Sequence, residues 1–196
     1  MKILLLSDTH GSLGRVYEIY EKLSGIDLIL HCGDYQSDAY QLEDNLGIPV
    51  VSVRGNCDGA MRPDRKVVET PHGRILITHG HTEGAGFSYD KLLYAGEEEN
   101  CIAVCFGHTH AAMNEDFGGI RLINPGSLSE PRDGSGGTYA ILRSTEEEFY
   151  ANIVRYDRIC GTGGNNGSGT KNGKTAEKPK TKGGFLRGLL NYSDRF

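Results

Sequence analysis

The chain has 196 residues, which suits one domain of ordinary size with enough length to bury a core. From residue 160 onward seven Lys or Arg face two acidic residues, so the total charge of −5 leaves about −10 on residues 1–159. An acidic body argues against a nucleic-acid partner, because affinity for nucleic acid rests mainly on neutralised phosphates. The five cysteines form no Cys-x-x-Cys pair, and neither a signal peptide nor a membrane span is recognisable. We therefore expect a cytoplasmic protein with free thiols.

The first apolar run, Ile3–Leu6, predicts a buried strand of the kind found inside α/β sheets. Asp8 and His10 follow it at once, and their side chains leave an extended chain on the same side. A carboxylate and an imidazole side by side can bind a metal ion. Taken alone the pair is weak evidence, because Asp and His are also ordinary turn residues.

The same plan returns in four more segments, each an apolar run that ends in Gly together with Asp, Asn or His. Residues 28–30 are followed by Asp34, and residues 48–53 by Asn56, Cys57 and Asp58. Residues 75–78 are followed by His79 and His81, and residues 101–106 by His108 and His110. Ligands of open α/β sheets collect beyond the carboxyl ends of the strands. Five such ends are therefore expected to converge on one pocket.

The other segments alternate between helical and hairpin patterns. Helical spacing predicts helices over residues 12–23, with Ser12 as the cap, and over 38–46 and 88–98. Turn signals predict hairpins that join 66–69 to 74–78, 113–117 to 120–123, and 138–143 to 149–156. Helices combined with strands of both orientations predict an α/β fold with more than one sheet.

The composition changes near residue 160. We expect a domain over residues 1–159 and a flexible linker rich in Gly, Asn and Lys over 160–184. Residues 185–196 regain Phe and Leu at a spacing that predicts a short amphipathic helix. This tail could dock on a protein partner, contact a membrane surface weakly, fold back onto the domain, or have no role.

Together these motifs resemble the calcineurin-like metallophosphoesterase superfamily, and GNCD and NPGSLSEPR resemble its small YfcE-type phosphodiesterase branch. The resemblance covers about residues 1–157 and includes all five blocks of the superfamily in order. It implies two stacked mixed β-sheets flanked by helices, the αββα sandwich. It also implies a small phosphodiester as substrate.

The resemblance assigns seven metal ligands to two divalent ions. One ion would be held by Asp8, His10, Asp34 and His110, and the other by Asp34, Asn56, His79 and His108, with Asp34 as the bridge. Such mixed ligands suit Mn²⁺, Fe²⁺, Ni²⁺ or Zn²⁺, among which Mn²⁺ is expected, and the lack of a thiolate cluster argues against a structural zinc. A pair of ions can clamp the attacking and leaving oxygens and make hydroxide available near neutral pH.

Other residues near the blocks are weaker candidates. Asp58 is expected to orient a ligand or a water, and His81 to lie in the outer shell or at the pocket rim, where it could supply a proton. Arg132 is about equally suited to contact substrate phosphate or to form a surface ion pair. His31, inside a strand, is expected to be a packed and hydrogen-bonded core residue.

The function predicted from these residues is metal-dependent hydrolysis of phosphodiesters by a metal-bridging hydroxide, in which Asp34, Asn56, Asp58 and His81 take part. Two alternatives remain open. The first is a metal-dependent nuclease, against which the acidic body and the absence of a basic aromatic groove argue. The second is a non-catalytic scaffold, as in the retromer subunit of the same fold, which has lost key ligands. The oligomeric state is not predicted.

Overall fold

The computed structural model describes residues 1–59 and 62–161, and in these residues ten strands form two five-stranded sheets. The first sheet contains β1 (Lys2–Leu6), β2 (Leu28–His31), β3 (Val50–Ser52), β9 (Thr138–Ser144) and β10 (Phe149–Arg155) in the order β10-β9-β1-β2-β3. The second contains β4 (Arg65–Glu69), β5 (Arg74–Thr78), β6 (Cys101–Cys105), β7 (Ala112–Phe117) and β8 (Ile120–Pro125) in the order β4-β5-β6-β8-β7. In the first sheet β1, β2 and β3 are parallel, and β9 and β10 extend the sheet with antiparallel pairing. In the second sheet β5, β6 and β8 are parallel, and β4 and β7 are antiparallel edge strands.

The sheets stack face to face because their central strands are apolar on both faces. In β1, Ile3 and Leu5 point into the core between the sheets, where they join Ile75 and Ile77 of β5. Leu4 of the same strand points outward, into the cluster formed with the helices on that side. A continuous apolar run is thus what a strand needs when both of its faces are buried.

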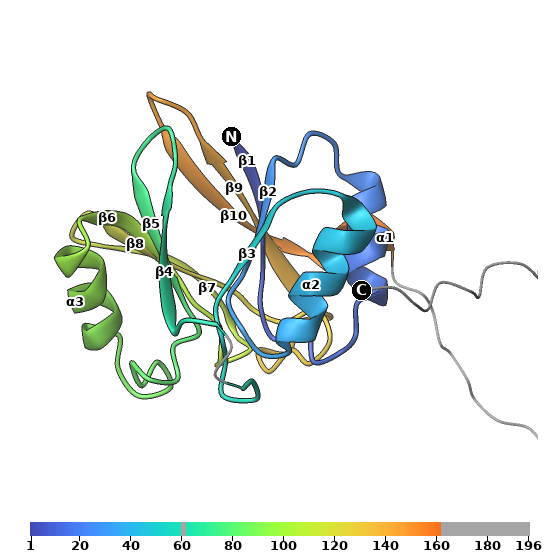
Figure 1. Cartoon of the computed structure of the whole chain (residues 1–196), viewed down its shortest axis with the longest axis horizontal. Coiled ribbons are helices and arrows are strands. Elements are labelled where there is room, and N and C mark those ends of the chain that lie inside the picture. Colours follow the sequence, from blue (N-terminus) through green and yellow to red (C-terminus); the bar gives the residue numbers. More distant parts are fainter. Residues whose placement is uncertain (60–61, 162–196) are drawn as a thin grey trace, which may run out of the picture. The chain divides into compact units, whose positions relative to one another are not determined.

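Four helices complete the described part of the chain: α1 (Gly14–Lys22), α2 (Gln36–Leu46), α3 (Asp90–Glu98) and α4 (Tyr156–Cys160). α1 and α2 cover the outer face of the first sheet, and α3 covers the outer face of the second (Figure 1). Val16, Ile19, Ala39 and Leu42 are fully buried on the first side, and Leu92 is fully buried in α3. The predicted αββα sandwich is therefore confirmed.

Some local predictions differ from the structure. Ser12 does not cap α1, because the helix begins at Gly14 with Leu13 at the cap position, while the Ser12 amide donates to Thr9 O in the preceding turn. The short helix α4 was not predicted, since five residues give too little periodicity. The predicted linker (160–184) and tail (185–196) lie outside the described residues except for positions 160 and 161. No helix in the described ranges is long and apolar enough to cross a membrane.

Candidate metal centre

The carboxyl ends of five strands, three from the first sheet and two from the second, meet at one edge of the sandwich. Every predicted ligand lies just beyond one of these ends: Asp8 and His10 after β1, Asp34 after β2, Asn56 after β3, His79 after β5, and His108 and His110 after β6. Hydrogen bonds join the ends both across the two sheets and within the second sheet. The His108 amide donates to Asp8 Oδ2 at 3.0 Å, and the Gly107 amide donates to His79 O.

The backbone at this edge is strained. Seven non-glycine residues in the described ranges have positive φ, and five of them are predicted ligands: Asp8, His10, Asp34, His108 and His110, with φ between 48° and 68°. Each such residue costs about 1–2 kcal/mol relative to the right-handed region. Strain of this kind persists where the surroundings over-determine the conformation, and it is concentrated at functional sites.

Two glycines explain why Gly accompanies the polar residues in these motifs. A Cβ on Gly55 would lie 2.8 Å from Asp34 Cγ and closer still to the Asp34 backbone nitrogen. A Cβ on Gly107 would lie 2.6 Å from Asp8 Oδ2 and 2.8 Å from Ser7 Cβ. These positions need glycine because the strand ends approach more closely than any side chain allows.

Hydrogen bonds to backbone carbonyls fix the orientation of two imidazoles. His79 Nδ1 lies 2.8 Å from Cys32 O, and His110 Nδ1 lies 2.7 Å from Glu130 O. A carbonyl can only accept, so each Nδ1 carries a proton, and in the neutral ring Nε2 presents a lone pair. Both lone pairs then point into the space between the strand ends, which is the arrangement that metal-binding histidines adopt.

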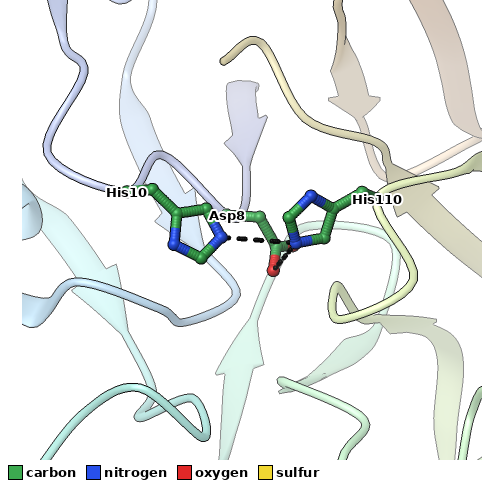
Figure 2. Close-up of side chains that lie close together, drawn as sticks. All are labelled: Asp8, His10 and His110. Atoms are coloured by element: carbon green, nitrogen blue, oxygen red, sulfur yellow. Dashed lines mark hydrogen bonds and ion pairs between the residues drawn. The ribbon is translucent and has the colours of Figure 1, made fainter. Parts of the chain in front are cut away.

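The Nε2 atom of His110 faces other acceptor atoms. It lies 3.2 Å from Asp8 Oδ1 and 3.3 Å from His10 Nε2 (Figure 2). Such a group is stable only when a proton or a cation lies between the atoms. Without a metal ion the proton is favoured, because the hydrogen bond to Asp8 raises the pKa of His110. Asp8, His10 and His110 offer ligand atoms that all lie within 4.8 Å of one another.

A second set of acceptors lies beside the first. His79 Nε2 is 3.5 Å from Asp34 Oδ1 and 3.1 Å from Asn56 Oδ1, which in turn is 2.9 Å from His108 Nδ1. Ligand atoms around one cation bound at 2.0–2.2 Å are about 3–4 Å apart. Both sets have this spacing, so the donor set fits divalent cations.

Burial opposes ionisation of Asp8, yet the hydrogen bond with His110 and the nearby charge of His79 outweigh it and lower the pKa of this carboxyl. Burial, followed by the nearby charge of His79, lowers the pKa of His108. Asp8 is therefore a carboxylate and His108 a neutral imidazole at neutral pH. These are the protonation states that metal coordination requires.

Buried polar residues outside the predicted ligand set hold the strand ends in place, and of these the sequence analysis singled out only His31. His31, which is fully buried as predicted, contacts the Thr9 hydroxyl at 3.0 Å, and Thr9 donates to Asp38 at 2.6 Å. Asp38 also accepts from the Gly11 amide. On the other side the Ser127 hydroxyl donates to Asp8 O at 2.8 Å. The one available signal for Ser127 was the NPGSLSEPR motif that contains it.

The weaker candidates lie around this centre. Asp58 accepts from the Gln36 amide at 2.7 Å and the Gly55 amide at 2.8 Å, so it fixes the loop that carries Asn56. The His81 ring is 5.3 Å from that of His79. Its buried Nδ1 has no hydrogen-bond partner in the described residues, and burial lowers the pKa of the ring. Arg132 has an exposed side chain, and its amide donates to His110 O.

Comparison with known proteins agrees with this geometry. The model of the calcineurin-like phosphoesterase superfamily domain matches residues 1–147. The chain belongs to this superfamily. A probable metallophosphoesterase of Bacillus subtilis, YsnB, is 35% identical over 162 residues, which cover 81% of this chain and 92% of that protein. Phosphodiesterase YfcE of Escherichia coli K12 is 28% identical over 170 residues, covering 72% and 87%.

A solved structure supports the same assignment. A conserved uncharacterized protein of Streptococcus pneumoniae TIGR4, described as a predicted phosphoesterase, superposes with a TM-score of 0.68 at 30% identity and covers 80% of this chain and 90% of its own. The resemblance inferred from the motifs is thus confirmed. The expected enzyme class, a metal-dependent phosphoester hydrolase, is confirmed with it.

Proposed function

We propose that the protein hydrolyses phosphodiesters with two divalent metal ions held at the strand ends. The observation that carries this proposal is the convergence of carboxylate, amide and imidazole groups whose potential ligand atoms lie about 3–4 Å apart. Mixed ligands of this kind suit Mn²⁺, Fe²⁺, Ni²⁺ and Zn²⁺, and we expect Mn²⁺. The names of the relatives, metallophosphoesterase and phosphodiesterase, support the same chemistry.

Asp34 is the proposed bridge between the two ions. Its two oxygens face different imidazoles, since Oδ2 lies 3.8 Å from His10 Nε2 and Oδ1 lies 3.5 Å from His79 Nε2. We assign one ion to Asp8, His10, Asp34 and His110, and the other to Asp34, Asn56, His79 and His108. Two bound ions would neutralise the phosphate and lower the pKa of a shared water, so that hydroxide is available as the nucleophile.

Neighbouring residues hold these proposed ligands in position, and one of them is proposed to protonate the leaving group. Asp58 keeps the Asn56 loop in place through the Gly55 amide, and the carbonyls beside His79 and His110 orient the rings. His81 is the proposed proton donor for the leaving oxygen, because its ring lies next to the centre without being one of the assigned ligands. Since burial lowers the pKa of this ring, the donor is the protonated form, which is the minor form near neutral pH.

Five free cysteines support a reducing compartment, and we propose the cytoplasm. The tail at 185–196 is proposed as a docking segment for a protein partner on the basis of its sequence alone. Of the alternatives, the scaffold is disfavoured because all seven expected ligands are present. The nuclease is disfavoured by the acidic body.

The test is a metal titration of protein stripped with EDTA. We expect hydrolysis of bis(4-nitrophenyl) phosphate to rise with added Mn²⁺ and calorimetry to find two bound equivalents. Absence of turnover with each of Mn²⁺, Fe²⁺, Ni²⁺ and Zn²⁺, despite metal binding, would favour the scaffold. Cleavage of single-stranded DNA at a higher kcat/KM than any small diester would favour the nuclease.

A further inference from the structure

A cavity of about 510 Å³ opens directly beside the metal centre. Its wall includes His108 at the end nearest the centre, Tyr89, Phe106 and Met113 as the apolar part, and Glu115 and Arg132 as the charged part. Cavities of 300–1,000 Å³ lined by apolar side chains with a few polar groups are typical small-molecule sites. The volume therefore admits an organic group and not only a phosphate.

The cavity shares its inner wall with the proposed ligands. His108 belongs to both, and Ala111 and Ala112 continue the chain from His110 along the cavity. The Arg132 amide donates to His110 O at 3.0 Å, so the backbone of this cavity-lining residue lies beside a proposed ligand. A phosphodiester bound at the centre would thus direct one of its two substituents into the cavity.

The far wall is suited to a flat ring. The rings of Tyr89 and Phe106 are 5.9 Å apart at 57°, and the Phe117 ring lies 6.1 Å from that of Tyr89, so Tyr89 is held in place by two aromatic neighbours. Met113 and Glu115 alternate with Asn114 along β7 and leave the strand on the same face. A methionine thioether adapts to aromatic surfaces and contacts them favourably.

The charged residues limit what the substituent can carry. Neither Glu115 nor Arg132 has a side-chain ion pair within the part of the chain that the structure describes. Arg132, whose backbone lies beside His110, can contact phosphate oxygens or stack on a ring. Glu115, further along β7, repels an anionic substituent but accepts hydrogen bonds from an amino group.

We propose that this cavity is a subsite for one uncharged aromatic substituent of the phosphodiester, an aryl group or a nucleobase. The proposal rests on the proposed function, which places the phosphate at the metal ions. The subsite selects diesters with a flat aromatic group over diesters with two small alkyl groups. It also disfavours substituents that end in a carboxylate or a second phosphate.

Binding of two inert phosphonates tests the subsite without any turnover. With Zn²⁺-loaded protein, we expect phenylphosphonate to bind about 10-fold more tightly than methylphosphonate, because only the first buries a ring. The Met113→Asp variant should lose this ratio while its affinity for methylphosphonate stays within threefold. Met113→Leu and Tyr94→Ala, the latter exposed and outside the cavity, should keep the ratio.

Methionine methyl NMR is a second measurement of binding, and it is made on the protein without a disruptive substitution. The chain has three methionines, so the Met113→Leu spectrum identifies the Met113 signal. Phenylphosphonate should shift this signal through its ring current, and methylphosphonate should not. Equal affinities of the two phosphonates, an unmoved Met113 signal, or binding of neither ligand would overturn the subsite.

The charge selection has its own test. We expect 4-carboxyphenylphosphonate to bind about threefold or more weakly than phenylphosphonate, and Glu115→Gln to remove the difference. An unchanged ratio in Glu115→Gln would remove Glu115 from the subsite. The phosphonate affinities are measured without turnover, so they test the subsite independently of catalysis. Diester hydrolysis without a ring preference refutes the subsite alone, while ring binding without hydrolysis refutes the proposed function alone.

Discussion

The two sheets contribute different chemistry to the centre. The first sheet supplies both carboxylates and the amide, from Asp8, Asp34 and Asn56, together with His10. The second sheet supplies only imidazoles, His79, His108 and His110. One half therefore carries the negative charge of the proposed ligand set, and the other contributes imidazoles.

The centre therefore depends on the stacking of the two sheets, because neither sheet alone supplies the whole proposed ligand set. Short hydrogen bonds join the halves at this edge. The His108 amide donates to Asp8, and His79 donates to Cys32 O on the opposite sheet. The apolar core between the sheets thus determines the distance between the carboxylates and the imidazoles.

The largest effect is expected from Asp34→Asn, because this change removes charge from the half that carries it. If Asp34 bridges the two proposed ions, both lose a ligand at once, so kcat should fall roughly 10³-fold at saturating Mn²⁺. Steady-state assays with bis(4-nitrophenyl) phosphate measure the loss. The matched control is Asp44→Asn, an exposed carboxylate of α2, which should stay within twofold. Activity of Asp34→Asn within tenfold of the parent would contradict the bridging assignment.

The second prediction breaks the contact between the halves. Gly107→Ala would place a methyl group 2.8 Å from Ser7 Cβ and 2.6 Å from Asp8 Oδ2, so the two sheets must move apart locally. We expect a loss of about 1–3 kcal/mol in the free energy of unfolding, together with a lower affinity for metal. Urea denaturation and metal titration measure these. Gly14→Ala, with open space around the new methyl group, is the control and should not destabilise. An unchanged Gly107→Ala protein would show that the halves are not interlocked there.

The sequence predicts that these residues gather at the strand ends because each predicted ligand comes after an apolar run and lies near a glycine, and both signals are local. The order of the strands and the pairing of the halves depend on contacts between residues far apart in the chain, which no local pattern encodes. The support from Asp38 and Ser127 escaped prediction for the same reason: their partners, Thr9 and Asp8 O, are 29 and 119 positions away. The cavity beside His108 was missed because Met113 and Glu115 look like ordinary residues of a hairpin strand.

A third prediction separates the two ions. Asn56 belongs to the first sheet, yet its Oδ1 lies within 3.1 Å of two imidazoles of the second. Asn56→Ala should weaken one ion about 10–100-fold and leave the other nearly unchanged. Calorimetry with Mn²⁺ would then resolve one tight and one weak site. Asn152→Ala, exposed on β10, is the control. Equal weakening of both ions would mean that Asn56 does not belong to one site.

The smallest effect is expected from Cys57→Ala. This variant tests which half of the molecule protonates the leaving group. Burial, together with Asp34 and Asp58, raises the pKa of Cys57 to about 11, so the thiol is a poor proton donor near neutral pH. Cys57→Ala should therefore change kcat by less than threefold for aryl and alkyl diesters alike. His81 lies in the half that carries the imidazoles, and His81→Gln should slow hydrolysis of alkyl diesters by about 10²-fold. Hydrolysis of 4-nitrophenyl esters should stay almost unchanged, because general acid catalysis matters only for poor leaving groups. A plot of log kcat against leaving-group pKa measures both. If the slope steepens in Cys57→Ala and not in His81→Gln, the proton comes from the first sheet and the assignment of the two halves is wrong at this point.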